Sequence, residues 1–437
     1  MYKRGRSWLV CLMLLLCGLC MSACSGEELL AEIPQTFQIV VEEEETEEEP
    51  EKEQESEQIP GQTPEQTLRR AKGGAAEEKT EQSEVIDSLF LMAETSHFAY
   101  NSLSQDWQLW YRDIEQALGN MEETVRLSDE GLAAGLDESC IDTIFQCVLN
   151  DHPEIFYVDG YTYTKYMRNG EVVAISFSGA YQLSKEEALQ KKKEIQQAVK
   201  EVLRGISPNA SAYEKVKYVF ETIIRNTDYD LNAPDNQNVY SVFVGKSSVC
   251  QGYAKATQYL LNQLGIECTL VQGTVENGEG HAWNLVRVDG SYYYIDTTWG
   301  DASYRLEDGT DTAIGYLPEI NYDYFCVTTK QLLQTHTLDN VVPVPECVDT
   351  AANYYVRQGA LFTAYDKDQM KRLFENASQQ QLPDVTVKCV DLCCYEEIMD
   401  ALIEKQEIFD YILGDCSQVS YAHNEKQLSL TFWVTNQ

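Results

Sequence analysis

Three residues in this sequence have the chemistry and the chain order that nucleophilic catalysis by a thiol requires. Cys250 lies near the start of a segment with helical periodicity, and His281 and Asp296 lie in two successive predicted strands. A thiolate can attack a carbonyl carbon, an imidazole can carry the proton, and a carboxylate can orient the imidazole. The sequence therefore predicts a catalytic site made of Cys250, His281 and Asp296.

The helix that carries Cys250 has a predicted start at Ser248. Ser248 and Gln251 have the spacing of a capping box, which places Cys250 at the second helical position, in an exposed first turn. The N–H groups at a helix start carry partial positive charge and favour a thiolate there. A buried core cysteine is the structural alternative, because free cysteine is among the most buried residue types.

A predicted hairpin brings His281 and Asp296 together. Asp289-Gly290 is a strong signal for a two-residue turn, which pairs Val288 with Ser291. Side chains alternate along a strand, so this register puts His281 and Asp296 on one face, whereas a three-residue loop would separate them. Taken singly, the histidine is a strand-end residue and the aspartate a turn former. Their combination with a helix-start cysteine favours catalysis.

Three motifs around these residues resemble those of a known family. They are "VCQGYAKA" (249–256), "HAWNLV" (281–286) and "YYIDTTWGD" (293–301). They resemble the transglutaminase-like superfamily of papain-type cysteine enzymes, in the branch found in bacterial surface proteins, over about a third of the chain. The resemblance implies a Cys-His-Asp triad at Cys250, His281 and Asp296. It also implies an α+β core in which the helix bearing the cysteine packs on an antiparallel sheet.

An attack by Cys250 would produce an oxyanion that needs hydrogen-bond donors. The Cys250 N–H, at the helix start, is one predicted donor. The second should come from the loop before the helix, where Gln237, Asn238 and Tyr240 are candidates.

The reaction class depends on what accepts the acyl group. Water gives a protease- or peptidase-type hydrolase, which we favour by family analogy, and a lysine amine gives a protein-glutamine crosslinking enzyme. A surface binding module without turnover is the third alternative. No calcium-binding motif is visible, so we expect neither a metal nor a cofactor.

The flanking regions have their own helical and strand patterns. Capping boxes at Ser184-Glu187 and Ser211-Glu214 start two further helices. His152, before Pro153, is interpreted as a structural residue. The predicted units are a signal peptide (1–23), an acidic disordered stalk (24–84), an N-terminal α/β module (85–208), the catalytic core (209–340) and a small α+β domain (341–437).

The N-terminus predicts export. Basic residues precede a short apolar run that ends in "MSAC", similar to a bacterial lipobox, so we expect a membrane lipoprotein anchored through lipidated Cys24. A plain secretory peptide cut near Ala23 and an uncleaved anchor are the alternatives. All three place the protein outside the membrane, where polypeptides or cell-wall peptides are the expected substrates.

Charge and cysteine content narrow the function further. The formal net charge is −38, and negative charge is densest in the Glu-rich stalk, where solvated like charges keep a chain extended. Such an acidic balance argues against nucleic acid as a partner.

Outside the signal, the cysteines show no spacing typical of a zinc site. A working Cys250 must stay reduced, which fits a poorly oxidising exterior.

Overall fold

The computed structural model describes residues 35–40, 97–301, 319–339, 341–412 and 419–433. The predicted signal peptide, the lipidation site Cys24 and nearly all of the predicted stalk lie outside these residues. Within the described part of the chain, no helix combines the length and apolarity needed to cross a bilayer.

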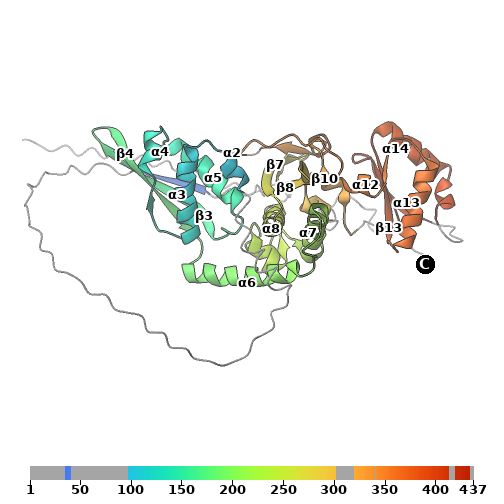
Figure 1. Ribbon diagram of the computed structural model, residues 1–437, viewed down its shortest axis with the longest axis horizontal. Coiled ribbons are helices and arrows are strands. Elements are labelled where there is room, and N and C mark those ends of the chain that lie inside the picture. Colours follow the sequence, from blue (N-terminus) through green and yellow to red (C-terminus); the bar gives the residue numbers. More distant parts are fainter. Residues whose placement is uncertain (1–34, 41–96, 302–318, 340, 413–418, 434–437) are drawn as a thin grey trace, which may run out of the picture.

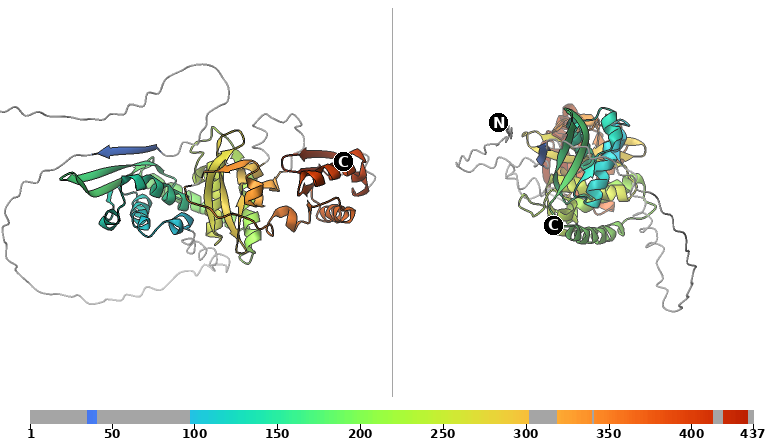
Figure 2. Two further views of the ribbon diagram at one scale, coloured as in Figure 1. Left: turned by 90° about the horizontal axis from the view of Figure 1, so that it is seen from above. Right: turned by 90° about the vertical axis from the view of Figure 1, so that its left-hand side faces the viewer.

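One part of the predicted stalk is structured. Gln35–Val40 forms strand β1, which pairs in parallel with β3 (Val158–Arg168) at one edge of a sheet (Figure 2). The prediction of disorder is therefore wrong for this segment. Its sequence, "QTFQIV", carries β-branched and aromatic residues that favour strands, and it extends an existing sheet edge.

The N-terminal unit is a four-stranded sheet with the order β1-β3-β4-β2. Buried residues of its helices and strands share one core with the central unit. Its further elements are α2 (Phe98–Ser102), α3 (Trp107–Asn120), β2 (Val125–Arg126), α4 (Asp129–Ala133), η2 (Glu138–Cys140), α5 (Ile141–Asp151) and β4 (Glu171–Tyr181).

Two long helices follow, and both begin as predicted. Ser184 and Glu187 form a capping box at the start of α6 (Lys185–Leu203). Ser211 and Glu214 do the same for α7 (Ala212–Asn226). Each box satisfies backbone N–H groups that a helix start leaves without partners.

The central unit has a five-stranded antiparallel sheet with the order β10-β9-β8-β7-β11. Helix α8 (Cys250–Gln263) packs on β7 and β8 and against α7 (Figure 1). The strands are β7 (Cys268–Val275), β8 (Gly280–Val288), β9 (Ser291–Ile295), β10 (Phe325–Val327) and β11 (His336–Leu338). The shorter elements are β5 (Asp228–Tyr229), η3 (Ser241–Gly245), β6 (Ser247–Ser248), α9 (Thr297–Gly300), η4 (Tyr322–Tyr324) and α11 (Thr329–Leu332).

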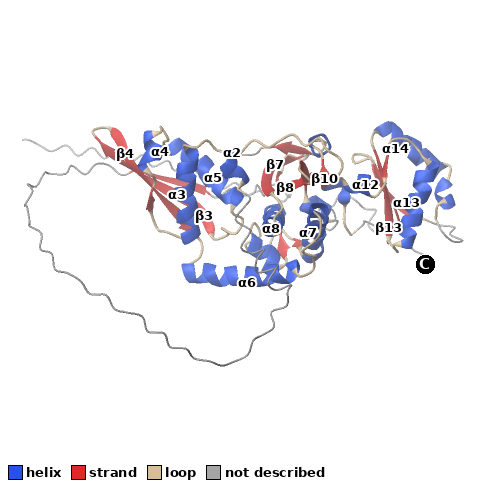
Figure 3. Ribbon diagram, in the orientation of Figure 1, coloured by secondary structure: helices blue, strands red, loops and turns tan. Residues whose placement is uncertain are grey.

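The C-terminal unit has a separate hydrophobic core. Its four strands have the order β12-β13-β15-β14, and Figure 3 shows helices beside them. The elements are α12 (Tyr354–Arg357), β12 (Leu361–Phe362), α13 (Lys367–Gln379), β13 (Asp384–Cys389), α14 (Leu392–Met399), η5 (Asp400–Glu404), η6 (Glu407–Asp410), β14 (Ser420–Asn424) and β15 (Ser429–Trp433). The fold class is α+β, as predicted.

A buried asparagine joins the N-terminal unit to the helix that carries Cys250. The Asn150 side chain donates to the Leu270 carbonyl at 3.1 Å and accepts from the Thr269 hydroxyl at 2.6 Å. Its carbonyl accepts from the Gln258 side chain of α8 at 2.7 Å. Because buried polar groups are costly without partners, these bonds fix α5 against α8 and β7.

Candidate active site

Cys250 is the first residue of α8, and the cap predicted for this helix is wrong. Val249 occupies the N-cap position and no side chain caps the helix. The Ser248 hydroxyl instead donates to the Asn236 carbonyl at 2.5 Å and contacts the Ser241 hydroxyl at 2.7 Å. Ser248 is fully buried, so its hydroxyl is used to hold the preceding loop rather than the helix start.

The predicted exposure of Cys250 is also wrong, because its exposed fraction is only 7%. Burial does not leave the thiol in purely apolar surroundings. Hydrogen bonding and charge at Cys250 both contribute to the raised pKa of His281, so the sulfur lies within interaction range of the imidazole.

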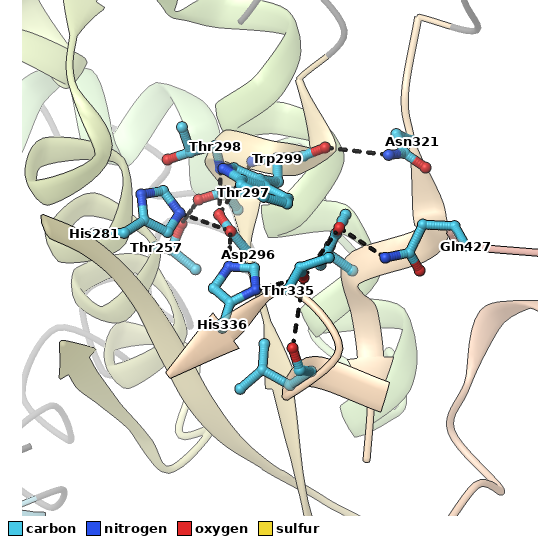
Figure 4. A network of polar contacts seen from close by, with 12 residues as sticks. Thr257, His281, Asp296, Thr297, Thr298, Trp299, Asn321, Thr335, His336 and Gln427 are labelled. Carbon is cyan, nitrogen blue, oxygen red and sulfur yellow. Dashed lines mark hydrogen bonds and ion pairs between the residues drawn. The ribbon is translucent and has the colours of Figure 1, made fainter. Parts of the chain in front are cut away.

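The hairpin prediction is confirmed. Val288 pairs with Ser291, and Asp289 and Gly290 have φ angles of 50° and 92°, which the favoured two-residue turn requires. His281 Nε2 lies 2.8 Å from Asp296 Oδ2, as the shared face implies (Figure 4).

Asp296 itself lies beyond the strand that was predicted to contain it. Strand β9 ends at Ile295, and Asp296 is the N-cap of α9. Its Oδ1 accepts from the backbone N–H groups of Thr298 at 2.9 Å and Trp299 at 3.1 Å. The helix cap therefore fixes one oxygen and leaves the other directed at His281.

The charges of this buried pair stabilise each other. Burial lowers the pKa of His281, but the charge and hydrogen bond of Asp296, with a smaller contribution from Cys250, outweigh it and raise that pKa to about 10. Burial raises the pKa of Asp296, yet His281 and His336 hold it well below its usual range. At neutral pH the ring is therefore an imidazolium. Because Nε2 faces Asp296, Nδ1 is the nitrogen that remains for Cys250, where a cation favours a thiolate.

Sequence reasoning missed His336. Its side chain is fully buried, and its Nε2 lies 3.2 Å from the same Asp296 oxygen that contacts His281 (Figure 4). Burial lowers the pKa of His336, which favours a neutral ring. Helix α11 ends at Leu332, and His336 begins strand β11. No local signal links it to Asp296, because β11 reaches the site only by pairing with β7.

Among the residues that the structure describes, two groups of side chains have donor atoms close enough for a metal ion. They are His281, Asp296 and His336, and a second group made of His97, Glu115 and His152; within each, the donor atoms lie within 4.8 Å of one another. In the first group, the nitrogen-to-oxygen distances of 2.8 and 3.2 Å are those of hydrogen bonds. His152, predicted to be structural, lies between Glu115 and Glu154 at 2.9 and 2.8 Å.

The loop before α8 lies directly against the helix start. A Cβ on Gly252 would lie 2.9 Å from the Asn236 carbonyl oxygen and 3.2 Å from that of Asn238. Only glycine fits without displacing this backbone. The loop that carries Gln237 is therefore held beside the first turn of α8, where an oxyanion donor would be needed.

The three predicted oxyanion side chains differ in availability. The Tyr240 hydroxyl donates to Glu194 of α6 at 2.7 Å, so the structure does not support Tyr240 as a donor. The Asn238 side chain accepts from the Tyr240 N–H at 2.8 Å and is used in local capping. Within the described residues, the half-buried Gln237 side chain makes no hydrogen bond, and it stays the predicted second donor beside the Cys250 N–H.

Comparisons with known proteins agree with this architecture. Residues 196–297 match the Transglutaminase-like superfamily. The chain is 25% identical over 146 residues to kyphoscoliosis peptidase of Mus musculus, covering 30% of this chain and 21% of that protein. The human kyphoscoliosis peptidase is 24% identical over 143 residues, with coverages of 29% and 21%. The chain thus spans about a fifth of the length of these curated relatives.

Solved structures with similar folds include a TGase, with a TM-score of 0.23, 15% identity and coverage of 36% of this chain and 53% of that chain. The periplasmic domain of TgpA from Pseudomonas aeruginosa has a TM-score of 0.21, 17% identity and coverages of 32% and 59%. Likeness at this level is too weak to support a functional argument. The family match is the finding that bears on the site: residues 196–297, which include Cys250, His281 and Asp296, are similar to the Transglutaminase-like superfamily.

Proposed function

We propose that this protein is a cysteine hydrolase that cleaves peptide or carboxamide bonds through Cys250, His281 and Asp296. The observation that carries the proposal is the buried His281-Asp296 pair with the Cys250 sulfur beside it at the start of α8. A nucleophile, a base and a group that orients the base form the minimum set for covalent acyl transfer.

In the first half of the reaction, the Cys250 thiolate attacks the carbonyl carbon of the substrate. The resulting oxyanion accepts hydrogen bonds from the Cys250 N–H and the Gln237 side chain. The imidazolium of His281 then donates its Nδ1 proton to the departing amine, and a thioester to Cys250 remains. Asp296 stays ionised and keeps the imidazole in place.

In the second half, neutral His281 removes a proton from water, and the hydroxide attacks the thioester carbon. The acid product leaves, and the proton held by His281 restores the imidazolium-thiolate pair. A lysine amine in place of water would give an amide crosslink instead. The names of the curated relatives, both peptidases, support water as the acceptor.

The proposed setting is the outer face of a cell membrane. Lipidation at Cys24 would anchor the enzyme close to the membrane, because only residues 25–34 separate Cys24 from strand β1, and the proposed substrates there are polypeptides or cell-wall peptides. Globomycin treatment of the producing cells, followed by membrane fractionation, tests the anchor: retention of the uncleaved precursor is expected, and unchanged processing would contradict lipidation.

The activity is tested with the full chain on peptide and wall-fragment libraries, with hydrolysis and amine incorporation measured separately. Cys250→Ala should abolish the activity. Cys393→Ala is the matched control, because Cys393 is exposed and lies in the C-terminal unit. Amine incorporation without hydrolysis would identify a crosslinking enzyme. If wild type and Cys250→Ala behave alike in both assays, the protein is a non-catalytic binding module.

A further inference from the structure

A continuous row of polar contacts leads from Asp296 into the C-terminal unit (Figure 4). His336 contacts the Asp296 carboxylate through Nε2 at 3.2 Å and the Thr335 hydroxyl through Nδ1 at 2.8 Å. The Thr335 hydroxyl lies 3.3 Å from the Tyr324 hydroxyl. That hydroxyl accepts from the Gln427 side chain at 2.8 Å, and Gln427 belongs to the turn between β14 and β15.

The donors and acceptors in this row have one consistent direction. The ionised Asp296 carboxylate can only accept, so His336 donates from Nε2 and accepts at Nδ1 from Thr335. Gln427 donates to Tyr324, whose O–H can donate to Thr335. The Thr335 hydroxyl also lies 3.5 Å from the Leu332 carbonyl, but the His336 contact is much shorter. The opposite tautomer would point a lone pair of His336 at a carboxylate.

The row is held at both ends. The Asp296 backbone N–H donates to the Tyr324 carbonyl at 3.0 Å. Tyr324 is therefore linked to Asp296 twice, directly through the backbone and through its hydroxyl by way of Thr335 and His336. At the other end, Lys388 lies 3.3 Å from the Gln427 amide oxygen and 2.8 Å from Asp323, and these side chains are buried. The Gln427 amide is therefore oriented with its NH₂ group toward Tyr324.

We infer that His336 is a positioning residue for Asp296, and that Gln427 makes its alignment depend on docking of the C-terminal unit. The inference rests on the proposed function. A second hydrogen bond to the same carboxylate oxygen restricts rotation of Asp296 and keeps that oxygen at His281. The C-terminal unit thus takes part in aligning Asp296 through Gln427.

The direct test alkylates the full chain with iodoacetamide and follows the Cys250 and Cys393 peptides by mass spectrometry at pH 6 and pH 9. In wild type, Cys250 should react faster than Cys393 at pH 6, because the His281 ring and the helix start activate its sulfur as a nucleophile. His336→Phe should slow Cys250 at pH 6 by about 10- to 100-fold, the range for a hydrogen bond to a charged group. At pH 9 the alkylation rates of Cys250 in wild type and in His336→Phe should converge.

Rescue separates positioning from mere folding. His336→Gln can still donate to the carboxylate and should recover most of the lost rate, whereas a general packing role would make it as slow as His336→Phe. Where His336→Phe does not fold, Thr335→Val keeps the side-chain shape and removes the hydroxyl. It should slow Cys250 at pH 6 by about fivefold, the size of one ordinary hydrogen bond.

Dependence on the C-terminal unit is tested with two neighbouring variants. Gln427→Leu should slow Cys250 at pH 6 by about fivefold. Lys426→Ala removes an exposed contact between the same two units, the 2.5 Å pair with Glu276, and should leave the rate unchanged. Equal slowing by both would overturn the role of Gln427.

The failures are distinguishable. If wild-type Cys250 reacts no faster than Cys393, the proposed function fails and the positioning role with it. If wild-type Cys250 is fast and the His336, Thr335 and Gln427 variants match it at pH 6, the inference alone is overturned.

Discussion

The described residues contain two histidine and carboxylate clusters that look alike on chemical grounds. One comprises His281, Asp296 and His336, and the other His97, Glu115 and His152. In each cluster, burial lowers the pKa of one histidine, but neighbouring carboxylates outweigh this effect and raise that pKa to about 10. A strongly perturbed histidine pKa therefore occurs twice and cannot by itself identify the catalytic site.

The groups around the two cationic rings are different. His281 contacts one carboxylate and the Cys250 thiol, whereas His152 has a glutamate on each ring nitrogen. Both nitrogens of His152 are thus used in ion pairing, and neither is directed at a nucleophile. The comparison teaches that the group on the second ring nitrogen is what distinguishes His281, the proposed catalytic imidazole, from His152.

A second difference concerns the thiols. Cys147 lies on α5, near the second cluster, and burial, with a smaller effect of Asp151, raises its pKa to about 12. Such a cysteine stays protonated and inert. Cys250 is also buried, with 7% of its surface exposed, but lies beside an imidazolium at a helix start. Burial alone therefore does not decide whether a thiol in this fold reacts.

The largest expected effect separates the two cationic histidines. His281→Gln should lower kcat/KM by about 10²- to 10⁴-fold, because it removes the proton carrier. His152→Gln should leave kcat and KM within about twofold once both proteins are folded, since it contacts no reacting atom. Steady-state hydrolysis of one identified peptide gives both values. A large loss of kcat in His152→Gln would erase the distinction.

The next effect concerns the proposed oxyanion donor Gln237, in the loop beside the start of α8. Gln237→Ala should lower kcat by about 10²- to 10³-fold and leave KM nearly unchanged, because its amide would bind charge that develops in the transition state. Gln380→Ala, an exposed position on the C-terminal unit, is the matched control. A change confined to KM would show that Gln237 binds ground-state substrate instead.

The sequence allowed prediction of the parts of the site that depend on local rules. Two capping boxes, at Ser184 and Ser211, form as expected, because a cap involves residues only three positions apart. The Asp289-Gly290 turn determined the register of β8 and β9, and with it the contact between His281 and Asp296. A two-residue turn leaves little freedom in pairing.

Prediction failed where distant segments compete for the same atoms. Ser248 has the right spacing for a cap, but the loop carbonyl of Asn236 takes its hydroxyl. His336 reaches Asp296 through the pairing of β11 with β7, which no local pattern encodes. The same holds for Gln427, whose contact with Tyr324 crosses between two units. These contacts depend on tertiary packing.

The pH dependence of hydrolysis should follow His281 and not His152. In the proposed mechanism the imidazolium of His281 protonates the leaving amine, so kcat should fall as pH rises through its pKa of about 10, by about tenfold for each further pH unit. His152 loses its proton in the same range. In His152→Gln the alkaline limb should therefore be unchanged, as measured from pH 5 to 11 with a peptide substrate. Disappearance of that limb would assign it to His152.

The smallest expected effect is on stability, and here His152 should act. Its pKa is raised in the folded state, so its ion pairs stabilise the fold fully below the ordinary histidine pKa of about 6.5. That contribution is lost as pH rises from there to about 10. Because Glu115 and Glu154 are partly exposed, we expect about 1–2 kcal/mol.

Urea unfolding of wild type and His152→Gln at pH 6 and pH 10 measures this contribution. The difference in unfolding free energy between the two proteins should be largest at pH 6 and should shrink toward pH 10. Other groups, including His281, titrate alike in both proteins and cancel in the comparison. A difference that is the same at both pH values would mean that His152 stabilises the fold by packing and that its two glutamates do not hold a proton on it.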